Sequence, residues 1–282
     1  MPIKLNPDEF KVISRYVYTM TGIHLDDSKM YLVETRMGKL VEESGCSSFS
    51  EFYYKATSDP ARILQRKIID AITTRETLFF RDTAPFEMLQ FKVLPDLIDR
   101  RTKPAGRLAS TGIRIWSAAC SSGQEVYSIA IVLKELLGDL GKYKITLLGT
   151  DISDAAIALA SRGHYNKFEI DRGISKEKLT QYFTQEKDEW KIRDEIRAVA
   201  TFRKINLMEN FIGMGKFDIV FCRNVAIYFT EEDKIKLFNK IKGVMETDGY
   251  LMIGSTESLT GLNIPFEPRR YLRSVFYQIK QS

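Results

Sequence analysis

The first 75 residues have apolar positions at helical spacing and show no strand pattern. Asn6, Pro7 and Glu9 form a typical helix start, and the apolar positions that follow continue until Gly22. The same spacing predicts helices over residues 27–45, 49–56 and 59–72, and a connecting helix over 85–101. A polar, basic stretch at 100–110 ends the segment that connects the helical front to the rest of the chain. The pattern therefore predicts an all-helical N-terminal domain.

From residue 113 onward, apolar runs of strand length alternate with helical segments. Strands are predicted at 113–117, 144–149, 199–204, 217–222 and 250–254, and a last strand at 272–279 should pair antiparallel at or near the end of the sheet. This alternation is typical of an α/β fold with a mostly parallel sheet and helices on both faces. Residues 161–197 are too many for a simple crossover and too charged for a core strand, which predicts an inserted subdomain that carries a hairpin.

These patterns divide the chain into three parts. We place the helical domain at 1–82, a connecting helix and linker at 83–110, and the α/β domain at 111–282. The inserted subdomain is expected at 162–197.

Composition narrows the class of protein. The 282 residues are 44% hydrophobic and 28% charged, a soluble globular balance, and no apolar run approaches the roughly 20 residues of a membrane span. The start of the chain has no apolar signal core. The three cysteines have no metal-type spacing, and two histidines leave little for a triad or a metal site. The net charge of +5 comes without a basic run, so we expect a cytoplasmic protein that binds neither metal nor nucleic acid and does not insert into a membrane.

Residues 113–125 read as a buried strand, a turn of small residues and a helix. This geometry is typical of a nucleotide site, but the turn has one glycine, Gly123, where a dinucleotide fingerprint needs three. The ligand is therefore expected to lack a pyrophosphate, and S-adenosylmethionine fits that requirement. Because any doubly wound domain opens in this way, the pattern alone leaves other ligands open.

Two acids lie where parallel strands end. Asp151 has the spacing of the acid that accepts hydrogen bonds from ribose hydroxyls, although it could also be the N-cap of the next helix. Glu125 could balance the positive charge of a sulfonium or ammonium group. It could also be an ordinary first-turn acid that the helix dipole favours.

Two further segments carry candidate chemistry. Arg223 and Asn224 directly follow a buried strand, where such folds present side chains to the transferred group; the alternative is a strand end with a surface arginine. Residues 73–82 could form a lid at the domain junction. They could also be a helix start with Phe79 and Phe80 in the core.

Five motifs together carry a family resemblance. They are Thr-x-Glu-Thr-x-Phe-Phe-Arg at 74–81, Trp-Ser-Ala-Ala-Cys-Ser-Ser-Gly-Gln-Glu at 116–125, Gly-Thr-Asp-Ile-Ser at 149–153, Phe-Cys-Arg-Asn-Val-x-Ile-Tyr-Phe at 221–229 and Gly-Ser-Thr-Glu-Ser at 254–258. In this order the chain resembles the CheR family of chemotaxis receptor methyltransferases over essentially its whole length. The resemblance implies a Rossmann-like class I methyltransferase sheet with a small β-subdomain insertion, preceded by an all-α domain.

The resemblance also implies an activity and a partner. The expected activity is that of an S-adenosylmethionine-dependent protein-glutamate O-methyltransferase, with S-adenosylhomocysteine as product. The substrates are then glutamate side chains on cytoplasmic helices of chemoreceptors. Matching positions imply a set of cofactor-binding residues: Thr77, Arg81, Glu125, Asp151, Asn206, Leu207, Arg223 and Asn224.

Three positions depart from the family pattern. Arg75 replaces a usual asparagine; we keep it among the cofactor-binding residues, although the replacement leaves its contact open. Ser255 stands where histidine is common, and Val126 where proline is usual.

The expected reaction needs no general base, because a glutamate carboxylate is ionised at neutral pH and is itself the nucleophile. Rate must then come from alignment and from fixed hydrogen-bond donors that replace water. Arg81 and the Tyr228 hydroxyl are the donors expected near the acceptor oxygen, and we predict both as catalytic.

Substrate recognition gives two more expectations. Arg36 and Lys39, on the polar side of the second helix together with Lys29, are predicted to dock acidic receptor helices; a merely solvated helix face is the alternative. Some family members bind a receptor's C-terminal pentapeptide through a glycine-rich hairpin loop in the inserted subdomain. Because residues 182–193 contain no glycine here, we predict an enzyme independent of such a tether.

Without the family resemblance, the residues leave three other classes of protein open. A nicotinamide oxidoreductase would need the missing glycines. A nucleic-acid amino-methyltransferase typically has a Pro-Pro pair after the asparagine, which Val225 and Ala226 do not supply. A non-catalytic protein that senses S-adenosylmethionine would keep the same motifs.

Overall fold

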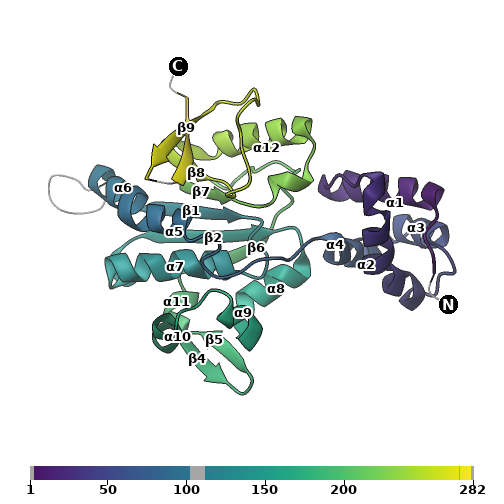
Figure 1. The fold of residues 1–282 in the computed structure, drawn as a ribbon, viewed down its shortest axis with the longest axis horizontal. Helices are drawn as coiled ribbons and strands as arrows, with labels where there is room; N and C mark the ends of the chain where they lie inside the picture. The colour runs from purple at the N-terminus through teal and green to yellow at the C-terminus, as the bar shows by residue number, and fades with distance from the viewer. Residues whose placement is uncertain (1–2, 102–111, 273, 281–282) are drawn as a thin grey trace.

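The computed structural model describes residues 3–101, 112–272 and 274–280. Four helices of the front part pack around one apolar core at one end of the molecule (Figure 1): α1 (Pro7–Thr21), α2 (Met30–Glu43), α3 (Phe49–Thr57) and α4 (Ile63–Ile72). We call them the helical unit. The predicted start of α1 is confirmed, because the Asn6 side chain accepts from the Glu9 N–H while the Glu9 carboxylate accepts from the Asn6 N–H. The second helix starts later than predicted, since Asp27–Lys29 form a 3-10 turn capped by Asp26.

A long interrupted helix leads from the helical unit to the sheet. It consists of α5 (Ala84–Met88), a π-helical turn (Leu89–Val93) and α6 (Leu94–Arg101), close to the predicted 85–101. The basic linker expected at 100–110 falls, from residue 102 onward, outside the described residues.

A seven-stranded sheet forms the centre of the second part, in the order β6-β2-β1-β7-β8-β10-β9. The first five strands in this order pair in parallel and the last two antiparallel. Their bounds are β1 (Ile113–Ala118), β2 (Ile145–Asp151), β6 (Ala200–Lys204), β7 (Phe217–Cys222), β8 (Met245–Met252), β9 (Phe266–Tyr271) and β10 (Ser274–Ile279).

Two strand predictions need correction. The edge strand β9 was not predicted, because Pro268 and two arginines interrupt its apolar pattern; an edge position tolerates all three. The strand predicted at 250–254 begins at Met245, and its pairing with β7 shifts register between Phe217 and Ile219. Gly249 lies at this irregularity.

Apolar side chains on the two faces of the sheet form separate cores. One face packs against α5, α6, the intervening π-helical turn and α7 (Gln124–Leu137), and the other against α12 (Glu231–Gly243). The helix α8 (Asp154–Arg162) follows β2 and contacts β2 and β6. No helix in the described part of the chain is both long and apolar enough to cross a bilayer.

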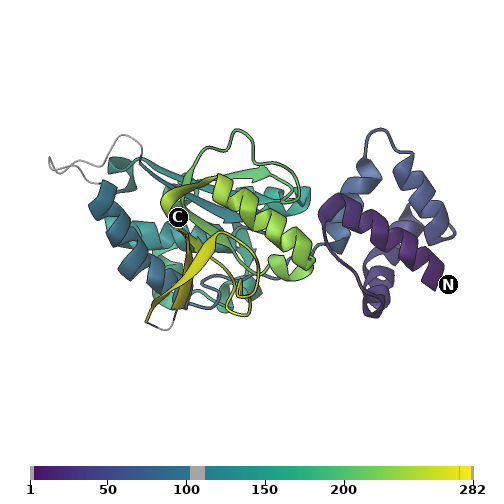
Figure 2. The same cartoon turned by 90° about the horizontal axis from the view of Figure 1, so that it is seen from above.

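Between α8 and β6 lies a small subdomain with a three-stranded antiparallel sheet, which projects below the main sheet in Figure 1. Its elements are β3 (His164–Asn166), α9 (Lys167–Asp171), α10 (Lys176–Tyr182), β4 (Phe183–Glu186), β5 (Glu189–Ile192) and α11 (Asp194–Arg197). The predicted fold is thus confirmed: an all-α front, a Rossmann-like sheet and a hairpin-bearing insertion. Figure 2 shows the helical unit and the sheet side by side along the long axis.

Candidate functional site

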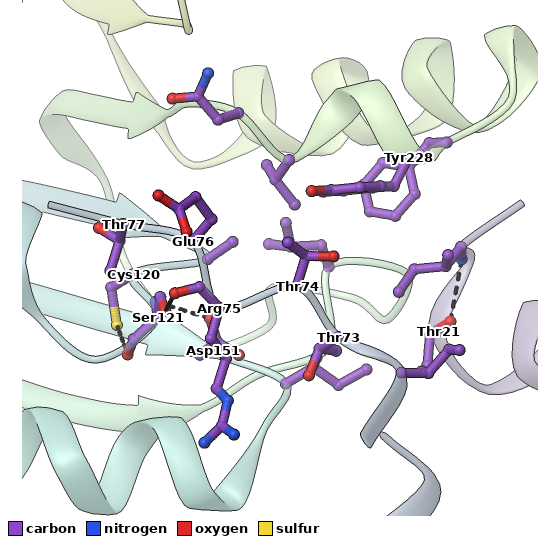
Figure 3. A pocket seen from close by; sticks show the side chains of 18 of the residues that line it. Thr21, Thr73, Thr74, Arg75, Glu76, Thr77, Cys120, Ser121, Asp151 and Tyr228 are labelled. Carbon is purple, nitrogen blue, oxygen red and sulfur yellow. Dashed lines mark hydrogen bonds between the residues drawn. The ribbon is translucent and has the colours of Figure 1, made fainter. Parts of the chain in front are cut away.

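One pocket lies where the parallel strands β1, β2, β6 and β7 end, facing the helical unit (Figure 3). Its empty space is about 1290 Å³, including the part open to solvent. The pocket is thus a hollow that opens to solvent between the two parts of the chain. Every residue predicted to bind cofactor or to be catalytic lines this pocket: Arg75, Thr77, Arg81, Glu125, Asp151, Asn206, Leu207, Arg223, Asn224 and Tyr228.

The turn between β1 and α7 has a strained backbone. Ala119 and Ser121 have φ values of 60° and 51°, which L side chains rarely adopt, and each costs about 1–2 kcal/mol. Gly123 has φ 93°, and a Cβ there would lie 2.9 Å from the Cβ of Ala160 in α8. The single glycine therefore serves close packing of the turn against α8. The strained turn is held by two hydrogen bonds to the end of β2, from the Cys120 N–H to the Thr150 carbonyl and from the Ser121 N–H to the Asp151 carboxylate.

Asp151 lies at the end of β2, buried against this turn. Its Oδ2 accepts from the Ser121 N–H at 2.9 Å and its Oδ1 from the Ser153 N–H at 2.9 Å. Burial raises the pKa of Asp151, and these backbone donors oppose the shift. The N-cap alternative is wrong, because the Ser153 hydroxyl caps α8 by accepting from the Ala156 N–H. The carboxylate instead fixes the turn and lines the pocket beneath it.

Arg223 joins both sides of the pocket. Its Nη1 donates to Glu125 Oε2 at 2.8 Å, and its Nη2 donates to Asp82 Oδ2 and to the Arg81 carbonyl, also at 2.8 Å. Only 1% of its side chain is exposed, so the alternative of a surface arginine is wrong. The Glu125 carboxylate also accepts from the Ser117 hydroxyl. Glu125 thus forms an ion pair with Arg223, in addition to its favourable position in the first turn of α7.

The segment from Thr73 to Thr83 is an extended strap followed by a tight turn. The alternative of a helix start is wrong here, because α5 begins only at Ala84. Phe79 is fully buried and packs edge-on against Tyr165 and Phe183 of the inserted subdomain. In the turn, Phe80, Asp82 and Thr83 have positive φ, and the Arg81 guanidinium donates to the Glu76 carbonyl. In Figure 3 Tyr228 lies across the pocket from Thr73 and Asp151.

The helical unit supplies a wall of the pocket that the sequence did not predict. It contributes Thr21, Ile23, His24, Leu25, Lys29 and Leu32. Nothing in the local pattern at 21–32 indicates a ligand, because these residues reach the site only through the packing of two distant parts of the chain. Asp82 was also missed: it lies beside the predicted Arg81, but only its contact with Arg223 reveals its place.

Direct contacts hold this wall against the sheet. The Asn206 side-chain amide donates to the Met20 carbonyl at 2.8 Å, and the His24 N–H donates to the Tyr228 carbonyl at 2.9 Å. Gly22, with φ 75°, ends α1, and a Cβ there would lie 2.6 Å from the Met208 side chain. Asn206, predicted to bind the cofactor, therefore also connects the two parts of the chain.

Arg36 and Lys39, the two predicted docking residues, lie outside the pocket lining, whereas Lys29, expected beside them on the second helix, belongs to the 3-10 turn before α2 and lines the pocket. The Arg36 guanidinium donates to the Ile72 carbonyl at 2.7 Å and to the Thr74 hydroxyl, so it ties α2 to the start of the strap. Lys39 is exposed and forms an ion pair with Glu43 one turn later.

The pocket suits a ligand that combines an apolar ring with polar and cationic groups. Leu207, Phe229 and the partly buried Ile152 offer apolar surface, whereas Asp151 and Glu125 present carboxylates nearby. Within residues 3–101, 112–272 and 274–280, no three His, Cys, Asp or Glu side chains are grouped to hold a metal ion.

Two family models match the chain. The model described as CheR methyltransferase, SAM binding domain, matches residues 75–273, and the model described as CheR methyltransferase, all-alpha domain, matches residues 8–73.

Similar full-length proteins have chemotaxis names. The chain is 38% identical to the chemotaxis protein methyltransferase Cher2 of Pseudomonas putida, over 98% of each chain. It is 39% identical to a chemotaxis protein methyltransferase of Vibrio parahaemolyticus, over 99% of each chain. It is 36% identical to the chemotaxis protein methyltransferase 1 of Pseudomonas aeruginosa, over 96% of this chain and 98% of that one.

Proposed function

The chain belongs to the CheR methyltransferase family, and on that premise we propose that it methylates glutamate side chains of chemoreceptors in the cytoplasm, for chemotactic adaptation. The products are glutamate methyl esters and S-adenosylhomocysteine. The observation that supports this most is the pocket at the strand ends, which is lined by a buried carboxylate at the end of β2 together with hydrogen-bond donors from the strap and from Tyr228.

The residues of the pocket fit S-adenosylmethionine. Asp151 keeps carboxylate lone pairs beyond its two backbone bonds, as a ribose hydroxyl requires, and Leu207 and Ile152 offer apolar surface for an adenine ring. Glu125 places negative charge on the side where a sulfonium and an ammonium would lie, although Arg223 offsets part of it. When bound, the cofactor supplies an electrophilic methyl group. We propose Arg75, Thr77, Asn206, Arg223 and Asn224 as further residues of the cofactor site.

Hydrogen-bond donors of this chain must position the acceptor carboxylate. An ionised glutamate needs no base, so the protein must orient one carboxylate oxygen and replace its water. Arg81 and Tyr228 are the proposed donors, since both line the pocket and they come from different segments, the turn before α5 and the 3-10 turn Ala226–Tyr228 after β7.

The helical unit is the proposed receptor-docking part. Of the two predicted docking residues on α2, Lys39 is free for this role apart from an exposed ion pair, which is worth little. Arg36 already binds the strap, so any role in docking would add to its structural one.

We propose that recognition does not use a C-terminal pentapeptide tether. The β4–β5 turn is built from Glu186, Lys187, Asp188 and Glu189, and Lys187 takes a positive φ of 56° there without glycine. Bulky charged side chains at this turn obstruct a backbone that would add as a strand. Calorimetry with the isolated pentapeptide should therefore show no heat of binding, and micromolar affinity would overturn this part of the proposal.

Transfer of radiolabelled methyl from S-adenosylmethionine to a chemoreceptor cytoplasmic fragment tests the proposed function. The label should remain at neutral pH and be released by mild base as methanol, as an ester requires. Label that resists base would mean a different acceptor. Cofactor binding without any transfer would mean a sensor rather than an enzyme.

A further inference from the structure

A second hollow lies on the helical unit, between α1 and α3, and shares no residue with the site pocket. Its floor and rim come from the outward face of α1 and from the facing side of α3. We call it the α1–α3 groove, and the residues that matter below are Lys11, Arg15, Tyr16, Tyr53 and Tyr54.

Three tyrosines form a continuous aromatic surface in this groove. The rings of Tyr16 and Tyr53 meet edge to face at 5.4 Å between centroids, and those of Tyr53 and Tyr54 at 5.6 Å. Tyr54 is 69% exposed, although it is a large ring on a short helix. Tyrosine and arginine are the residue types most enriched at the energetic centres of protein interfaces, since each joins apolar area to a hydrogen-bonding group.

The charged side chains that line the groove are all positive. Two cations, Lys11 and Arg15, line it, and no carboxylate does. Within the described chain, the Arg15 guanidinium has no hydrogen-bond or ion-pair partner. Lys11 pairs only with Asp8, and both side chains are at least 70% exposed, so the pair contributes little and exchanges easily. Carboxylates of a partner would therefore find an available cation.

The groove and the proposed reaction site both include residues of α1. Thr21, the last residue of α1, lines the site pocket, and Arg15 precedes it by six residues, about 9 Å along a helix axis. A packed α-helix is about 10–12 Å wide. A helical bundle that presents a glutamate to the pocket would thus place a neighbouring helix alongside α1.

We propose that the α1–α3 groove docks an acidic helix of the receptor bundle, next to the helix that carries the acceptor glutamate. This proposal rests on the proposed function. Two adjacent helices with aromatic ridges accept a third helix between them, and carboxylates on that helix meet Arg15 and Lys11.

Charge reversal of Arg15 tests the proposal. Arg15→Glu should weaken binding of a soluble chemoreceptor cytoplasmic fragment about tenfold, measured by sedimentation or calorimetry, and raise the KM for that fragment equally. The kcat and the affinity for S-adenosylhomocysteine should stay unchanged, because no groove residue lines the site pocket. Tyr54→Ala, which leaves the core intact because Tyr54 is exposed, should act in the same direction.

Lys67→Glu is the matched control, since Lys67 is exposed on α4 and lines neither hollow. It should bind the fragment like the wild type. If Arg15→Glu and Tyr54→Ala both match Lys67→Glu in receptor affinity, the groove proposal is wrong, while methyl transfer by the wild type still stands. If the wild type binds the fragment but transfers no methyl, the proposed function fails and the affinity comparison still decides on the groove.

Discussion

At the scale of single residues, Arg223 joins three segments that lie far apart in the sequence. It directly follows β7, pairs with Glu125 in the first turn of α7 and holds the turn at residues 81 and 82. The ring of Phe86 lies 5.7 Å from its guanidinium carbon. A buried charge of this kind is maintained only while both partners remain, because removing one partner leaves the other unpaired at a cost of about 3–5 kcal/mol.

Asp82 is expected to affect turnover through its ion pair with Arg223. Asp82→Asn keeps the size of the side chain but removes the charge that holds Arg223 Nη2 and, with it, the strained turn that carries Arg81. Loss of a charge-assisted bond worth about 1.5 kcal/mol should lower kcat about tenfold. The affinity for S-adenosylhomocysteine should change little, because Asp82 does not line the pocket.

Two matched variants accompany this measurement. Asp82→Glu restores the charge and should recover part of the turnover. Ser255→Ala removes only the 3.1 Å bond from the Ser255 hydroxyl to Asp82 and should stay close to the wild type. Equal losses of affinity and turnover in Asp82→Asn would assign Asp82 to binding instead.

The proposed donors are tested by Arg81→Lys and Tyr228→Phe. Each should lower kcat about 10²-fold, the scale of a misplaced reacting group, with a much smaller change in cofactor affinity. Single-turnover kinetics together with calorimetry separate the two quantities. Wild-type turnover in both variants would rule out the assignment.

Spacing alone placed in the site only residues at the ends of strands, whereas Arg75, Thr77 and Arg81 were placed there by the family resemblance. Parallel strands end at one edge, so Asp151, Arg223 and Asn224 could be brought together from spacing alone. The role of Arg223 as a buried link could not, because its burial depends on Asp82 and Glu125, which lie about 100 residues or more away in the chain.

At the scale of elements, the contact between α1 and α12 joins the helical unit to the sheet. The Tyr18 hydroxyl donates to Asp233 Oδ2 at 2.6 Å, and the Thr230 hydroxyl donates to the same oxygen. Burial tends to raise the pKa of Asp233, but these hydrogen bonds and the charge of Lys236 outweigh it and hold the pKa below its ordinary value.

Tyr18→Phe should therefore lower the thermal stability in a pH-dependent way. A depressed carboxyl pKa contributes stability above the unfolded value near 3.9, and that contribution is lost as the pH falls through the folded value. The hydroxyl is partly exposed, so we expect about 1 kcal/mol, or about 2 °C in Tm, at pH 7. The difference from the wild type should shrink below about pH 4.

Tyr31→Phe serves as the control for this prediction, since Tyr31 is 68% exposed and its hydroxyl has no hydrogen-bond partner in the described ranges. It should melt like the wild type at both pH values. A Tm difference for Tyr18→Phe that does not depend on pH would show that Asp233 is not the partner that matters.

Elements were predictable where one physical signal dominated. The strand β7 was predicted with its observed bounds, because a mainly apolar run of strand length is followed by polar Arg223. The edge strand β9 was not predicted, since an edge strand needs no continuous apolar run. Its pairing with β10 depends on the hairpin as a whole.

At the scale of the whole molecule, the pocket has walls from both parts of the chain. Its lining residues at 21–25 belong to the helical unit, and those at 119–121 and 205–207 belong to the sheet. Sequence reasoning assigned the helical unit to receptor docking alone, because the closing of the pocket arises only from the tertiary arrangement.

Cofactor binding should therefore slow amide hydrogen exchange in both the helical unit and the part of the chain that forms the sheet. In hydrogen exchange, S-adenosylhomocysteine should slow the amides at 21–25 and 74–77 as well as those at 119–125. The amides of α3, which contributes nothing to the pocket, should exchange as before. Protection confined to residues after 112 would contradict a shared pocket.

The shared wall has a thermodynamic consequence. A ligand that shifts residues 21–25 relative to the sheet changes the affinity for the cofactor, and the cofactor must change the affinity for that ligand by the same factor. If the receptor docks on the helical unit, the two substrates become coupled without touching. Accumulation of S-adenosylhomocysteine would then alter how tightly the enzyme binds its receptor.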